Sequence, residues 1–140
     1  GIWMATWAAA RALDGPLAAG GAELFEGRRV LELGSGCGLL GVALAGVARS
    51  VVLTDFGPGA ATAPSDPGRL IPPGLLRNLR SNVALNGLTN AEVRHLDWHD
   101  FLARPGRPAA TPAERFELIA AADVVYYKAD LAALAAATAA

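Results

Sequence analysis

Residues 30–41 read Val-Leu-Glu-Leu-Gly-Ser-Gly-Cys-Gly-Leu-Leu-Gly. The first four residues have strand preference and lead directly into glycines at alternate positions, Gly34, Gly36 and Gly38. Apolar residues then recur at helical spacing, so the stretch predicts a strand, a tight turn and a helix. Glycines in such a turn permit positive φ and let a ligand lie directly against the backbone. The sequence therefore predicts a ligand site at this turn.

The glycine turn alone does not identify the ligand, because a Gly-x-Gly turn after a strand also binds dinucleotides. This copy departs from the dinucleotide pattern, since Leu39 stands where that pattern has glycine or alanine. Glu32 also lies two residues before the first glycine, where it would repel a pyrophosphate. A ligand with a positive end suits the site better. S-adenosylmethionine, which has sulfonium and ammonium groups and no phosphate, is such a ligand.

Length and composition exclude several classes of function. The 140 residues are expected to form one domain, residues 1–140, with net charge −1 and no basic cluster, so no nucleic-acid partner is expected. The single lysine, Lys128, does not follow the glycines as a P-loop requires. The single cysteine, Cys37, provides neither a disulfide framework nor a thiolate metal site. No signal peptide or membrane span is recognisable, so we expect a cytoplasmic protein without a membrane partner, the nucleus and the oligomeric state being left open.

A second strand is predicted at residues 50–54 and ends in Asp55. Asp55 follows 19 residues after Gly36, near the distance at which α/β nucleotide folds place an acid that binds ribose hydroxyls. The segment Phe56 to Pro73 is read as a long surface loop, either an insertion or a lid. Helices are predicted at residues 5–13 and at 75–85, the second ended by Asn86-Gly87.

A third strand is predicted at residues 91–96, followed by Asp97-Trp98-His99-Asp100. One interpretation places His95, Asp97 and His99 on one face as metal ligands. The preferred interpretation has the strand leaving the sheet here, so no metal site is predicted. Asp97 and Trp98 could then hold an adenine ring, the carboxylate accepting from the exocyclic amine and the indole stacking.

A fourth, fully buried strand is predicted at residues 116–122, followed by Asp123 and a helix at 128–139. The alternation of strands and helices predicts an α/β fold with a parallel sheet, in which ligands bind at the carboxyl ends of the strands. Acidic residues stand at all four predicted strand ends, namely Glu32, Asp55, Asp97 and Asp123. Helix caps alone do not account for that arrangement.

Taken together, several segments resemble the seven-β-strand (class I) S-adenosylmethionine-dependent methyltransferases. They resemble in particular the protein-lysine methyltransferase group known as methyltransferase family 16. The matching segments are Ile2-Trp3, residues 30–39, Thr54-Asp55, residues 78–86, Leu96-Asp97-Trp98 and residues 122–126. The resemblance implies a Rossmann-like doubly wound parallel sheet with helices on both faces. The short motifs Asn-Gly-Leu and Leu-Asp-Trp are most similar to those of family members that modify translation elongation factor 2.

The resemblance also implies roles for individual residues. In the cofactor pocket, Trp3 would help to close the site, Gly34, Ser35 and Gly36 would contact the methionine part, Asp55 the ribose, Trp98 the adenine, and Ala122 would line the wall. Asp123 and Tyr126 match the Asp-x-x-Tyr motif beside the transferred methyl group. The implied function is transfer of a methyl group to the lysine ε-amine of a protein, for which the resemblance points to a translation factor.

The family's sheet has seven strands in the order 3-2-1-4-5-7-6, whereas this chain is expected to stop in the helix after the fourth, as a truncated domain. Three alternatives are considered. A non-catalytic methyltransferase-like binding domain is compatible with the truncation. A nicotinamide-dependent oxidoreductase shares the glycines and Asp55 but leaves Glu32 and residues 123–126 unexplained. Methylation of DNA bases is disfavoured, because those enzymes have an Asn/Asp-Pro-Pro-aromatic segment where this chain has Asp-Val-Val-Tyr.

Overall fold

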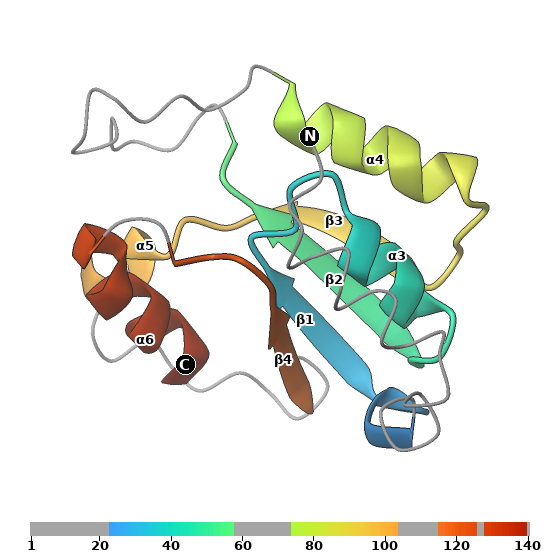
Figure 1. The fold of residues 1–140 in the computed structure, drawn as a ribbon, viewed down its shortest axis with the longest axis horizontal. Coiled ribbons are helices and arrows are strands. Elements are labelled where there is room, and N and C mark those ends of the chain that lie inside the picture. Colours follow the sequence, from blue (N-terminus) through green and yellow to red (C-terminus); the bar gives the residue numbers. More distant parts are fainter. Residues whose placement is uncertain (1–22, 58–73, 104–114, 126–127, 140) are drawn as a thin grey trace.

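The structure, a computed structural model, describes residues 23–57, 74–103, 115–125 and 128–139. In chain order its elements are β1 (Arg29–Leu33), α3 (Leu39–Ala45), β2 (Ser50–Asp55), α4 (Leu75–Leu85), β3 (Ala91–His95), α5 (His99–Ala103), β4 (Leu118–Ala121), a 3-10 turn η1 (Lys128–Asp130) and α6 (Leu131–Ala139). Strands alternate with helices, so the predicted α/β class is confirmed (Figure 1).

The four strands form one sheet in the order β3-β2-β1-β4, and every pairing is parallel. β1 lies in the interior of the sheet, where Val30 is in register with Val51 on one side and with Leu118 on the other. Because all four strands run the same way, their carboxyl ends meet at one edge. The glycine turn, Asp55 and the segments that follow β3 and β4 therefore converge there.

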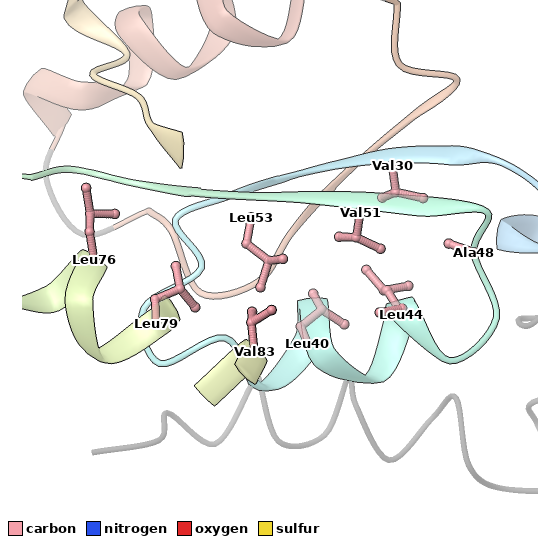
Figure 2. Close-up of a cluster of buried hydrophobic side chains, with 10 residues drawn as sticks. Val30, Leu40, Leu44, Ala48, Val51, Leu53, Leu76, Leu79 and Val83 are labelled. Carbon is pink, nitrogen blue, oxygen red and sulfur yellow. The ribbon is translucent and has the colours of Figure 1, made fainter. Parts of the chain in front are cut away.

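A hydrophobic core fills the space between the sheet and helices α3 and α4 (Figure 2). Alternate residues of the interior strands point into this core, among them Val30, Val51 and Leu53, and they meet Leu44 and Leu79 from the two helices. In the same view α6 lies on the other side of the sheet, so helices cover both faces as predicted.

Helix α4 has the bounds that its apolar spacing predicts. Leu76, Leu79 and Val83 are buried, whereas Leu85 is 83% exposed, so one face of the helix packs on the sheet and the other faces water. The helix follows Gly74, which adopts positive φ, and Gly87 adopts positive φ just after its end.

One prediction about the elements is wrong. The strand at 116–122 is shorter, Leu118–Ala121, and its exposure alternates instead of being fully buried, with Ile119 41% exposed. The reason is its outer position in the described sheet, where β1 is its neighbour. The segment after β3 leaves the sheet as expected, and there it forms the short helix α5, which was not predicted.

Several sequence predictions fall on residues outside the described ranges. These are the helix at 5–13, Trp3, Tyr126 and most of the loop between Phe56 and Pro73. Among the helices that are described, none has the length and apolar character needed to cross a membrane.

Candidate functional site

The turn between β1 and α3 has the backbone geometry that its glycines suggest. Gly34, Gly36 and Gly38 all adopt positive φ, at 67°, 56° and 91°. The backbone N–H of Ser35 donates to the Thr54 carbonyl at 2.9 Å, and the N–H of Gly38 donates to the Ser35 carbonyl at 2.8 Å. The turn is thus tied to the end of β2 and folded on itself.

Asp55 ends β2 directly beside this turn. Its Oδ2 accepts the backbone N–H of Gly36 at 2.6 Å, and its Oδ1 accepts the N–H of Phe56 at 2.7 Å. Two short bonds to a carboxylate fix the orientation of the side chain, which remains partly exposed. The 19-residue spacing noted in the sequence therefore corresponds to a direct contact between the acid and the glycine turn.

The first two glycines of the turn have different surroundings. A Cβ on Gly34 would lie 2.7 Å from Cγ1 of Val124 and 3.5 Å from Cζ2 of Trp98, so the lack of a side chain there makes room for two protein side chains. A Cβ on Gly36 would meet nothing within 4 Å among the described residues. The open face of the turn is therefore at Gly36, next to the Asp55 carboxylate.

Glu32 lies near the end of β1 and points into the protein, 2% exposed, beneath α3. Burial raises the pKa of this carboxyl from 4.5 to about 7, an effect that the adjacent Ser35 hydroxyl and Gly41 amide oppose in part. By geometry, however, the Ser35 hydroxyl lies near Glu32 without a hydrogen bond to it: among the described residues, Oε2 of Glu32 and Oγ of Ser35 are buried without a hydrogen-bond partner. A buried polar pair of this kind at the base of the glycine turn fits a ligand with a cationic end.

Asp97 is buried and serves the start of α5. Its Oδ1 accepts the backbone N–H of His99 at 2.9 Å and lies 3.1 Å from Nδ1 of the same histidine. Asp97 thus has a helix-capping contact, the role that the sequence analysis judged insufficient to explain all four strand-end acids. The suggested contact of Asp97 with adenine stays a prediction.

His95, the last residue of β3, and His99, the first residue of α5, make separate contacts. Nδ1 of His95 accepts the backbone N–H of Gly57 at 3.0 Å, and its ring meets that of Phe56 edge to face. His99 instead lies between Asp97 and Asp130. Across the described part of the chain, no group of three or more histidine, cysteine or acidic side chains is arranged to hold a metal ion.

Asp123 follows β4 and has φ of +58°, the single non-glycine residue with positive φ among those described. Such a conformation is uncommon for a side-chain-bearing residue, although aspartate tolerates it better than most, and it is found often at functional sites. The helical segment η1 begins at Lys128, five positions further on, so Asp123 does not directly cap it. Ala122, just before it, is partly buried and packs on the core.

Some residues of the site were missed by the sequence interpretation. Asn82 of α4 donates from Nδ2 to the Cys37 carbonyl at 2.7 Å, and Leu79 fills the space that a Cβ on Gly38 would need. Val124 covers Gly34. The one available signal was Asn82, which stands between Leu79 and Val83 on the side of the helix that carries the apolar residues. Packing against a glycine leaves no trace in a single sequence.

Comparison with known proteins agrees with this geometry. The sequence model of the family described as "Lysine methyltransferase" matches residues 1–63 and 72–139. A calmodulin-lysine N-methyltransferase from Arabidopsis thaliana is 29% identical over 108 residues, which is 76% of this chain and 30% of that protein. The chain therefore spans less than a third of the length of the curated relative that it matches.

Solved structures share the fold. The YcgJ protein from Bacillus subtilis has a TM-score of 0.50 and 16% identity, with 75% of this chain and 35% of that chain covered. A candidate RNA methyltransferase from Pyrococcus horikoshii has a TM-score of 0.51 and 16% identity, with 81% and 43% covered. At this identity they support the Rossmann-like arrangement alone.

The family match also bears on the cofactor. It confirms S-adenosylmethionine at the level of the family, and the open Gly36 face, the fixed Asp55 carboxylate and the buried Glu32 and Ser35 atoms fit that cofactor. With nearly all of its sequence matched and its strands in the expected order, the chain belongs to the lysine methyltransferase family.

Proposed function

We propose that this chain supplies the cofactor-binding part of an S-adenosylmethionine-dependent protein-lysine N-methyltransferase. The observation that carries the proposal is the Asp55 carboxylate, held by the Gly36 amide beside the open face of the glycine turn. This geometry offers fixed acceptors for two vicinal hydroxyls at the carboxyl edge of a parallel sheet. Family membership supports it.

Within the proposal, each part of the cofactor faces a different group. Asp55 binds the ribose hydroxyls, and Gly34, Ser35 and Gly36 lie along the methionine part. The Glu32 carboxyl faces the cationic end. Trp98 packs by the adenine, with Asp97 as an acceptor for its amine, Ala122 lines the wall, and Trp3 closes the pocket. The cofactor supplies an electrophilic methyl group; the protein's task is to bind, orient and exclude water.

Asp123 and Tyr126 are proposed to act on the substrate amine. In the transfer, a lysine nitrogen attacks the methyl carbon in line, the new N–C bond forms as the C–S bond breaks, and a proton leaves the nitrogen. The amine must be neutral, although its unperturbed pKa is about 10.4. A carboxylate would raise that pKa, so Asp123 is better suited to orient the amine than to deprotonate it. The strained backbone at Asp123 supports a positioning task.

The acceptor is proposed to be a protein. The Arabidopsis relative acts, by its name, on calmodulin, and the sequence resemblance instead pointed to a translation elongation factor. Both belong in an assay as candidate substrates. The cytoplasmic location stays a prediction of the sequence.

The two alternative functions have less support. A nicotinamide-dependent oxidoreductase would need a pyrophosphate near Glu32, whose Oε2 is buried at the base of the turn with no hydrogen-bond partner among the described residues. A non-catalytic binding domain would have no use for a constrained acid at the end of β4, yet Asp123 is held at positive φ.

The test is calorimetric titration of the purified chain with S-adenosylmethionine and, separately, NAD. We expect S-adenosylmethionine to bind and NAD not to bind. Asp55→Ala removes two charge-assisted acceptors and should weaken S-adenosylmethionine binding by about 10- to 100-fold. The exposed Glu92→Gln is the control for loss of a carboxylate and should bind like the unmodified chain.

Asp123→Asn completes the experiment, because asparagine also tolerates positive φ and keeps the backbone while removing the charge. It should leave cofactor affinity nearly unchanged and abolish methyl transfer to calmodulin or the elongation factor in the full-length enzyme. NAD binding, equal loss of binding in the Asp55 and Asp123 variants, or a folded chain that binds neither ligand would overturn the proposal.

A further inference from the structure

The segments that follow β3 and β4 meet away from the sheet. These two strands are the outer strands in the order β3-β2-β1-β4, so no hydrogen bond of the sheet joins them. Each nevertheless continues into a helix, and α5 packs against α6 beyond the carboxyl edge (Figure 1). The contact between these helices therefore sets the distance between the two segments.

His99 connects the two segments through its ring. Its Nδ1 lies 3.1 Å from Oδ1 of Asp97, which precedes α5, and its Nε2 lies 3.4 Å from Oδ1 of Asp130, in η1 before α6. Asp97 and Asp130 are 3% and 6% exposed. A neutral imidazole donates from one nitrogen and a protonated one from both, so the ring suits a place between two carboxylates. A hydrogen bond from an imidazole N–H to a carboxylate is stronger than one between neutral groups.

The same two segments supply the side chains over Gly34. Trp98 lies between Asp97 and His99 in the sequence, and Val124 lies in the segment that leads to Asp130. Both face the missing side chain of Gly34, Trp98 at 3.5 Å and Val124 at 2.7 Å from a Cβ placed there. The distance between Trp98 and Val124 thus depends on the contacts that hold the two segments together.

We infer that His99 is a positioning residue, which joins the Asp97 and Asp130 segments and so holds Trp98 and Val124 at the spacing that the Gly34 site requires. The inference that this spacing serves cofactor binding rests on the proposed function. The bridge itself does not, because it is made by the chain's own side chains. The experiment below therefore measures the bridge both with and without S-adenosylmethionine.

Three substitutions at His99 separate its two contacts. The side-chain amide of asparagine can replace Nδ1 as the donor to Asp97 but is too short to reach Asp130. The amide of glutamine can replace Nε2 as the donor to Asp130, and alanine has no donor for either contact. Asp97 still accepts the hydrogen bond from the backbone N–H of residue 99 in every variant, because that bond does not involve the side chain of residue 99. We therefore expect His99→Gln to retain function and His99→Asn to behave like His99→Ala. Asp100→Asn, an exposed acid on the same helix, is the control.

The first measurement is S-adenosylmethionine affinity of the full chain at a temperature where circular dichroism shows every variant folded. His99→Ala, His99→Asn and Asp130→Ala should each weaken binding about 10-fold, His99→Gln by less than about 3-fold, and the control not at all. The double variant His99→Ala with Asp130→Ala should bind no more weakly than either single one, since both remove one bridge. Equal effects of asparagine and glutamine, or additive losses, would contradict the inference.

The second measurement needs no cofactor. In a background of Trp3→Phe and Trp7→Phe, the fluorescence of Trp98 reports its exposure. Acrylamide quenching should rise at least about twofold in His99→Ala and His99→Asn and stay near the parent value in His99→Gln. If the parent chain fails to bind S-adenosylmethionine, the proposed function fails while this measurement still decides on the bridge. Unchanged quenching in His99→Ala would overturn the bridge whatever the affinity data show.

Discussion

Glu32 is a carboxyl group that the fold places almost entirely out of water. Its pKa rises from 4.5 to about 7, so the folded state binds a proton there more tightly than the unfolded state does. Below pH 4.5 both states are protonated and the group contributes nothing to the pH dependence. As pH rises from 4.5 to 7 the folded state loses stability, and above 7 the full cost, about 3 kcal/mol, is present.

Replacing Glu32 by glutamine tests this cost. The difference in unfolding free energy between Glu32→Gln and the parent chain should grow in favour of the variant by about 3 kcal/mol between pH 4.5 and pH 7.5. Urea unfolding at several pH values measures it. The exposed Glu23→Gln is the matched control. Parallel pH curves for Glu32→Gln and the parent would show that the carboxyl is not buried as described.

Among the elements, helix α4 connects the core to the glycine turn. Leu79 is fully buried in the core cluster and also fills the space next to Gly38 (Figure 2). One turn further on, Asn82 holds the Cys37 carbonyl. The turn is therefore supported from below by a helix that does not itself reach the open face at Gly36.

Substitution of a buried and of an exposed leucine on α4 distinguishes the effect of burial on stability from the effect of helix propensity. Leu79→Ala should lower the unfolding free energy by about 2–5 kcal/mol, because it leaves a cavity in a packed core. Leu85→Ala, at a position 83% exposed on the same helix, should change it by less than about 0.5 kcal/mol. Chemical denaturation of both variants is the measurement. Similar losses would mean that α4 does not pack as the structure shows.

The elements also show what a sequence can and cannot predict. Strands β1 to β3 and helix α4 were predicted nearly to the residue, because their apolar spacing and their bounding glycines are local signals. Helix α5 was missed, because it is five residues long and begins at a contact between Asp97 and His99. The burial of β4 was overestimated, because an apolar run does not say how many neighbours a strand has.

At the scale of the whole molecule, ligand binding and folding are linked. If the chain binds S-adenosylmethionine in its folded state alone, a concentration of 100 times Kd should stabilise it by about 2.7 kcal/mol. For a chain of 140 residues this corresponds to a rise in Tm of about 5–10 °C, measurable by thermal denaturation. Asp55→Ala should reduce the rise at the same concentration. A constant Tm over the same range would contradict binding to the folded state.

The site as a whole was predicted in outline only. The glycine turn and Glu32 follow from the pattern of one strand and turn, and Asp55 from its 19-residue spacing to Gly36; the structure brings the three together. Contacts between distant segments were not accessible in this way. Trp98 and Val124 meet over Gly34 because β3 and β4 lie on opposite sides of β1, a property of strand order rather than of any local pattern.

The same strand order has a consequence during synthesis. β1 can pair with β2 soon after both are made, whereas its pairing with β4 joins residues 88 positions apart, such as Val30 and Leu118. At ribosomal rates those 88 residues take about 4–18 s to make. During that time β1 has an unpaired edge open to other chains. Trp98 is synthesised before Val124. The contact of Val124 with Gly34 is therefore the last of these contacts to form.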